Sequence, residues 1–210
     1  MMINKFKLKI IVSSVVVLLP MIVGFSLWDK LPDSIATSFD WNGNITGYSS
    51  KTFAVVGLPA VLLVVNLICI AASCCDPKAK NISGKFFTLI LCIVPVCSIL
   101  CETIIYCKAL DYNLNIVNIF PVFIGILFII LGCFLPKCKQ NYTVGIKLPW
   151  TLHDEENWHK THKMAGPLWI GGGILIILAG LFQLEIVFAA VIIALGIIPA
   201  VYSYLLYKNK

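Results

Sequence analysis

The stretch VNIFPVFIGILFIILGCFLP, residues 117–136, contains no charged side chain. The hydrocarbon core of a bilayer is about 30 Å thick, and an α-helix needs roughly 20 apolar residues to cross it. Stretches of similar length and character recur along the chain, which gives six candidate spans at residues 8–28, 52–73, 86–107, 117–136, 165–184 and 186–207. The sequence therefore predicts an all-α, polytopic membrane protein built as a bundle of six transmembrane helices.

The overall composition supports this class. Of 210 residues, 60% are hydrophobic and only 12% are charged, whereas a water-soluble fold needs many more charges to cover its surface. The six spans use nearly all of the length and leave no room for a folded soluble domain. The net charge is +6, but no run of basic residues interleaves with aromatic residues. We therefore predict contact with membrane lipid and no direct nucleic-acid binding.

The lysines predict the orientation of the bundle. If the N-terminus is cytoplasmic, thirteen of the sixteen basic residues lie inside and only Lys30, Lys51 and Lys108 lie outside. Such a bias is typical of cytoplasmic loops. We predict cytoplasmic N- and C-termini in a bacterial plasma membrane. The nine cysteines lie within spans or at their ends, so we interpret them as packing residues and not as a disulfide framework.

Two polar connections stand apart from the spans. Residues 31–51 read LPDSIATSFDWNGNITGYSSK, and residues 140–163 read QNYTVGIKLPWTLHDEENWHKTHK. They divide the chain into a region at 1–75, with two spans and an extracellular loop, and a four-helix region at 76–210 with a cytoplasmic loop at 137–163. Recognition of any ligand or partner is expected in these two loops.

Turn and cap signals predict local structure in both loops. Asn42-Gly43 and Gly47 favour tight turns with positive φ, and Ser49-Ser50 can cap the second span. This turn-rich segment either recognises a ligand or simply covers the helices. In the other loop, residues 153–163 predict a polar helix at the inner membrane surface, capped by Thr151 or Asp154. That helix is also a plausible dock for a cytoplasmic regulator.

Both loops resemble the SdpI family of immunity and signalling membrane proteins. The extracellular pattern LPD…F…NG…GYSSK supplies the ligand- or toxin-facing candidates Asp33, Phe39, Asn42, Gly43, Gly47, Tyr48 and Lys51. The cytoplasmic pattern N-x-x-x-G-I-K-x-P-W-T-L, followed by E, W and T-H-K, supplies the partner-binding candidates Asn141, Gly145, Lys147, Pro149, Trp150, Thr151, Glu155, Glu156, Trp158, Thr161 and His162.

The resemblance implies a non-enzymatic protein that gives resistance to a secreted peptide toxin. It also implies possible sequestration of a cytoplasmic ArsR-type repressor at the membrane. In this interpretation the outer loop senses or neutralises the peptide, and the loop at 140–163 transmits the event. A ligand at the outer face would then favour one of two helix arrangements.

Two other functions remain open. Glu102 is the one acidic residue well inside a hydrophobic run, so it either faces the bundle interior or a cavity, or reaches water near the outer interface. Gly171–Gly173 permits either close helix contact or a break in the fifth span. With a break there, Glu102 could mark a small transporter or exporter of a peptide or amphiphile. His153, His159 and His162 beside two glutamates could mark a metal-dependent membrane enzyme. Their spacing is not HExxH, so we predict no metal, no other cofactor and no catalytic residues.

Overall fold

The computed structural model describes residues 2–112 and 114–209. Its long helices are α1 (Met2–Ser26), α2 (Leu58–Cys74), α3 (Gly84–Ala109), α4 (Ile116–Phe134), α6 (Glu155–Leu181) and α7 (Glu185–Lys208), with the short α5 at Pro149–His153. Six helical segments in the described part are long and apolar enough to cross a membrane, and they coincide with the six predicted spans. The predicted fold class is confirmed, and the chain is a multi-pass membrane protein.

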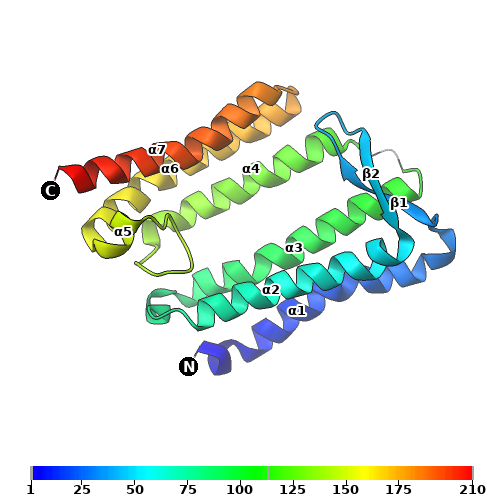
Figure 1. Ribbon diagram of the computed structural model, residues 1–210, viewed down its shortest axis with the longest axis horizontal. Helices are drawn as coiled ribbons and strands as arrows, with labels where there is room; N and C mark the ends of the chain where they lie inside the picture. The colour runs from blue at the N-terminus through cyan, green and yellow to red at the C-terminus, as the bar shows by residue number, and fades with distance from the viewer. Residues whose placement is uncertain (1, 113, 210) are drawn as a thin grey trace. The chain divides into compact units, whose positions relative to one another are not determined.

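The helices form two compact units (Figure 1). The first contains residues 1–75 and 83–116, hence α1, α2 and α3, and the second contains residues 76–82 and 117–210, hence α4 to α7. This division differs from the predicted boundary at residue 75, which assigned α3 to the later region. The reason is that α3 packs along α1.

Polar side chains join α3 to α1 inside the first unit. The Ser13 hydroxyl donates to the Leu91 carbonyl oxygen at 2.7 Å, and the Ser98 hydroxyl donates to the Val17 carbonyl oxygen at 2.9 Å. Hydrocarbon offers no hydrogen-bond partners, so polar groups in spans must find them on neighbouring helices. These two bonds therefore select α1 as the neighbour of α3.

The loop at residues 31–51 forms a β-hairpin, an element that the sequence analysis did not predict. β1 (Ser34–Phe39) pairs antiparallel with β2 (Ile45–Ser50), with Ser34 opposite Ser50 and Phe39 opposite Ile45. The predicted turn at Asn42-Gly43 is present, with φ of 79° at Gly43. The predicted turn at Gly47 is wrong. Gly47 lies within β2 opposite Ser38, where a Cβ would come within 3.3 Å of the Ser38 Cβ.

The hairpin rests on the ends of the helices in the first unit. Leu31, Ile35 and Val55 are buried in one cluster with residues of α3. As predicted, the Ser50 hydroxyl caps the second span by accepting from the Phe53 amide at 3.3 Å. The span begins with a π-helical turn at Phe53–Gly57 before α2 continues.

A seam of glycines holds α4 against α6 in the second unit. A Cβ on Gly125 would lie 2.5 Å from the Gly173 carbonyl oxygen, and one on Gly132 would lie 2.8 Å from the Gly166 carbonyl oxygen. Gly180 faces Pro121 in the same way. Because a backbone carbonyl oxygen is among the closest atoms at Gly125, Gly132 and Gly173 and cannot move aside, only glycine permits this approach there.

α6 is one continuous helix from Glu155 to Leu181, which corrects one expectation and settles another. The polar segment at 153–163 is not a separate surface helix, since its residues from Glu155 onward are the first turns of α6. Of the two alternatives for Gly171–Gly173, the break is absent and close helix contact is present, since Gly172 packs on Leu195 and Gly173 lies in the seam. Gly196 of α7 has no atom within 4 Å of the place where a Cβ would lie.

Candidate functional site

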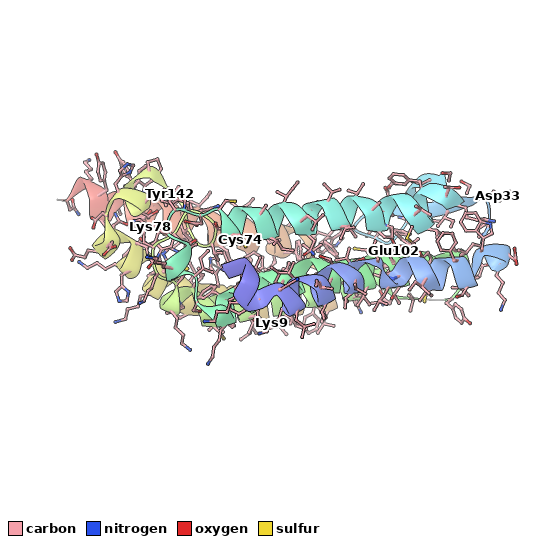
Figure 2. The ribbon with its side chains drawn as sticks, turned by 90° about the horizontal axis from the view of Figure 1, so that it is seen from below. Lys9, Asp33, Cys74, Lys78, Glu102 and Tyr142 are labelled. Atoms are coloured by element: carbon pink, nitrogen blue, oxygen red, sulfur yellow. The ribbon has the colours of Figure 1, made fainter. Side chains whose placement is uncertain are left out.

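The loop between α4 and α6 folds onto the segment that follows α2, and both belong to the second unit. The Asp76 carboxylate, which is 6% exposed, accepts hydrogen bonds from the Tyr142 amide at 2.8 Å and the Thr143 hydroxyl at 2.7 Å. It also accepts from the Lys78 amide at 2.7 Å. The Lys78 ammonium group lies 5.9 Å from the centre of the Tyr142 ring, and Figure 2 shows the two side chains together.

Two buried amide side chains complete this junction. The Asn141 Oδ1 atom accepts from the amides of Thr143 and Val144 at 2.9 and 2.7 Å, which closes a tight turn. The Gln140 side chain donates to the carbonyl oxygens of Thr151 and Leu152, both at 2.9 Å. Asn141, a predicted site residue, therefore organises the loop and is only 1% exposed.

Gly145, Trp158 and His162 form the centre of the site. The Ile146 amide donates to His162 Nε2 at 2.9 Å, and the other ring nitrogen lies 2.8 Å from the Trp158 carbonyl oxygen. Nε2 is thus the acceptor and Nδ1 carries the proton. The Trp158 and His162 rings stack with centroids 4.0 Å apart. Gly145 has a φ of 114° and passes directly over them.

The same motif binds the loop to α6 and α7. The Thr151 hydroxyl donates to the Ile146 carbonyl oxygen at 2.8 Å and accepts from the Leu148 amide at 2.9 Å. The Trp150 indole donates to the Ser203 hydroxyl at 2.7 Å, and the Asn157 side chain donates to the Ser203 carbonyl at 2.8 Å. The motif therefore gathers α5, α6 and α7 around Ser203.

Capping of α6 follows the sequence prediction. Asp154 is the N-cap, and its carboxylate accepts from the amides of Glu156 and Asn157 at 2.9 and 3.3 Å. Thr151, the other predicted cap, lies inside α5 instead. Glu156 forms an ion pair with Lys160 at 2.7 Å on the exposed face of α6.

The histidines do not converge on a metal position. Both ring nitrogens of His162 are occupied by backbone groups, and His153 Nδ1 lies 2.6 Å from the Pro149 carbonyl oxygen. Within residues 2–112 and 114–209, no group of three histidine, cysteine or acidic side chains is arranged to hold a metal ion.

The predicted partner-binding residues separate into a buried and an exposed group. Buried are Asn141, Thr151, Trp158, Thr161 and His162, while Gly145 and Trp150 are partly buried. Exposed are Lys147, Pro149, Glu155 and Glu156, and the exposed His153, His159, Lys160 and Lys163 lie near them in sequence. A cavity of about 540 Å³ opens beside this face, lined among others by Lys137, Lys139, Glu155 and His159. We call the exposed group the loop face.

Of the candidate residues of the hairpin, Asp33, Asn42 and Tyr48 are exposed, and the others are partly buried: Phe39, Gly43, Gly47 and Lys51. Asp33 and Lys51 form an ion pair at 3.2 Å, and the Lys51 ammonium group also donates to the Trp28 carbonyl oxygen at 3.3 Å. Lys51 thus stabilises the base of the hairpin. Asn42 and Tyr48 are exposed, and Tyr48 reaches 63%. In the turn, hydrogen bonding from the Asn44 side chain lowers the pKa of the Asp40 carboxyl below its ordinary value.

Two protein-family models match this chain, and each match includes one of the two polar loops. Residues 137–203 match the SdpI/YfhL protein family, and residues 15–63 match a domain of unknown function (DUF1648). The chain is 27% identical over 210 residues to the immunity protein SdpI of Bacillus subtilis strain 168. The match covers 96% of this chain and 97% of that protein. The chain is SdpI-like. No solved structure matches it significantly.

The two family matches coincide with the two polar loops. The match at 137–203 begins at the loop of the SdpI-like chain and ends at Ser203, the residue on which Trp150 and Asn157 converge. The match at 15–63 contains the whole hairpin. Asp76, Gln140 and Ser203 were missed by the sequence analysis. Their one signal was the presence of polar residues at the ends of spans, which does not identify partners.

We predict that high pH destabilises the loop around Cys138. Burial raises the pKa of its thiol to about 11, although a hydrogen bond from Asn141 opposes this. The folded pKa lies above the ordinary value of 9.0, so the contribution of the neutral thiol is complete below about pH 9. This contribution amounts to roughly 2–3 kcal/mol of folding stability, and it is lost as the pH rises towards 11.

Thermal unfolding at about pH 8 and about pH 10.5, on either side of the ordinary thiol pKa, measures this effect. The parent protein should lose more stability between the two pH values than the Cys138→Ala variant, since lysines titrate alike in both. An equal loss in the two proteins would show that the buried thiol does not contribute.

Proposed function

We propose that this chain is a membrane immunity protein that protects its cell from a secreted peptide toxin. The observation that carries the proposal is the similarity to the immunity protein SdpI over nearly the full length of both chains. A fragmentary match could reflect shared membrane helices, but this match includes both polar loops and all six candidate spans. The proposed action is non-enzymatic.

The hairpin is proposed to meet the peptide at the outer face. Its exposed side chains include the amide of Asn42 and the ring of Tyr48. Its packing on buried Leu31 and Ile35 gives a contact at the hairpin a direct route to the ends of α2 and α3. Peptide binding here would favour one arrangement of the first unit over another.

Survival of a toxin-sensitive bacterium tests the proposal. Cells that express the parent chain should grow at toxin concentrations that kill cells with an empty vector. Correct membrane insertion is verified by fractionation. Sensitivity equal to that of the empty vector, with the protein present in the membrane, would refute immunity.

We further propose that the loop face binds an ArsR-type repressor. The buried part of the motif fixes the loop, and the mixed charges of Lys147, Glu155 and Lys160 are available at its surface. A repressor tagged with a fluorescent protein should move to the membrane in the presence of toxin. Reversing the charges of Glu155 and Lys160 should abolish this movement while survival is retained.

We predict that the hairpin and the loop at 140–163 lie on opposite sides of the membrane, and reporter fusions test this. α2 starts just after the hairpin and ends at Cys74, and Asp76 then binds the loop that contains Tyr142. Because the helical segment Phe53–Cys74, which joins the π-helical turn to α2, is long enough to cross the bilayer, the hairpin and the loop should lie on opposite sides. Alkaline phosphatase fused at Asn42 should be active, and the same fusion at Lys147 should be inactive. Activity at both positions would contradict the proposed topology.

A further inference from the structure

Glu102 has an unusual environment in the first unit. It lies on α3 and is 1% exposed, and neither carboxyl oxygen has a hydrogen-bond partner within bonding distance and angle in the described residues. The Tyr106 hydroxyl lies beside the carboxyl, but it donates to the Pro20 carbonyl oxygen at 3.2 Å. A buried carboxyl without a partner is costly, and intramembrane acidic groups commonly mark functional sites. The expectation that Glu102 reaches water is therefore not supported.

Glu102 is one of the residues that line a recess between α1 and α3. The recess has a volume of about 230 Å³ and is lined by Leu19, Pro20, Val23, Ile99, Glu102, Thr103 and Tyr106. One water occupies about 30 Å³ of liquid, so the space admits a chemical group several times larger. Apart from Glu102, Thr103 and Tyr106, the lining side chains are hydrocarbon. An apolar wall with one acid at its end suits a cation carried on an aliphatic stem.

The position of the recess indicates where a ligand would enter. Glu102 is seven residues before the end of α3 at Ala109, which places it about 10 Å from that end. The same end of α3 packs under the hairpin through Ile105 and Tyr106. Figure 2 shows Glu102 between Lys9 and Asp33 within this unit and nearer to Asp33. Leu19 and Val23 are 42% and 50% exposed, so the mouth opens on the flank of the unit.

Among the described residues, no cationic side chain pairs with this carboxyl. In the described residues the two ion pairs are Lys51 with Asp33 and Lys160 with Glu156, and neither involves Glu102. The two stretches that line the recess carry no lysine or arginine, since none occurs between residues 10 and 29 or between residues 86 and 107. A cation that pairs with the ionised carboxylate would therefore have to come from outside the described residues.

We propose that the recess binds the primary ammonium group of an amphiphile dissolved in the membrane, with Glu102 as its counter-ion. This assignment rests on the proposed function in one respect: the natural amphiphile would be the peptide toxin, which would present a lysine or its amino terminus. The ammonium group donates to the two free carboxyl oxygens, and the aliphatic stem fills the apolar part of the recess.

Carbodiimide labelling of the intact protein in phosphatidylcholine vesicles tests the assignment. Dicyclohexylcarbodiimide reacts with carboxyl groups in apolar surroundings, and mass spectrometry of the α3 peptide reports modification of Glu102. Dodecylammonium at about ten times its dissociation constant should slow the labelling about tenfold, because about a tenth of the sites remain free. Dodecanol at the same mole fraction should leave the rate unchanged. Equal slowing by both, or none by the amine, would overturn the proposal.

A second experiment compares the unfolding temperatures of the parent protein and two variants. Dodecylammonium should raise the unfolding temperature of the parent protein and of Glu185→Gln, whose carboxyl lies at the exposed start of α7. It should not raise that of Glu102→Gln, a variant of equal size without the charge. A rise in all three proteins would refute the role of Glu102.

Two further labelling experiments, with peptides in place of dodecylammonium, identify the source of the ammonium group. An apolar helical peptide with one lysine should protect Glu102, and the same peptide with norleucine should not. Protection by dodecylammonium alone would exclude a peptide as the ligand. These assays contain no toxin, so their failure overturns the recess only, whereas a failed survival assay with positive labelling overturns the immunity proposal only.

Discussion

Replacing Gly173 with valine should lower the unfolding temperature by more than about 10 °C. A Cβ at this position would lie 2.6 Å from the Gly125 carbonyl oxygen and 2.8 Å from Ile129 Cγ1. Overpacking costs about 1–3 kcal/mol, and the upper end is expected here because a backbone atom cannot move aside. A loss of about 3 kcal/mol corresponds to a fall of roughly 10 °C or more for a unit of this size.

Gly171, two residues before Gly173, supplies a matched control. Gly171 has no atom within 4 Å of the position that a Cβ would take, so Gly171→Val should unfold at or above the parent temperature. Tryptophan fluorescence of the purified protein follows both variants, since Trp169 lies on α6 against Phe128 of α4. Equal destabilisation by the two substitutions would contradict the seam.

Substituting Gly145 with alanine should open the loop and expose Cys138. The φ of 114° is strained for any residue with a Cβ, and that atom would lie 2.4 Å from His162 Nε2. The strain costs about 1–3 kcal/mol, and displacement of the histidine adds the loss of its bond to the Ile146 amide. A cost near 3 kcal/mol would increase the open population, and hence the labelling of Cys138, by roughly 100-fold.

Mass spectrometry after treatment with a maleimide measures each cysteine separately. Cys75 is exposed and should react at the same rate in the parent and the variant. Gly196→Ala, a substitution into open space on α7, should leave Cys138 protected. Unchanged labelling of Cys138 in Gly145→Ala would show that the loop does not depend on this glycine.

The sequence predicted the spans because their signal is local and long. Lipid requires about 20 apolar residues, and no pairing with a distant residue is needed to recognise them. The cap at Asp154 and the turn at Gly43 were equally local. By contrast, the hairpin depends on which residues face one another across its two strands, and no spacing in the sequence identifies those pairs. The continuous course of α6 was missed because its polar first turns and its apolar remainder resemble separate elements.

The candidate site was predicted only in outline. The motif residues from Asn141 to His162 were found, but their roles depend on partners far along the chain. Asp76 acts on Tyr142 and Ser203 acts on Trp150, and neither pair has a sequence spacing that could reveal it. Glu102 was recognisable as an outlier in charge. Its recess was not, because a recess is the space left between α1 and α3 after their side chains have packed.

The unbroken course of α6 has a mechanical consequence. A helix of 27 residues measures about 40 Å, and this one includes both the stacked rings of Trp158 and His162 and the glycines that lie against α4. It has no hinge at its glycines. Pro167 lies between the aromatic end and the later of these glycines, Gly173 and Gly180, and removes one backbone hydrogen bond from the helix, so any tilt of the apolar end reaches the aromatic end through the turn that contains this proline.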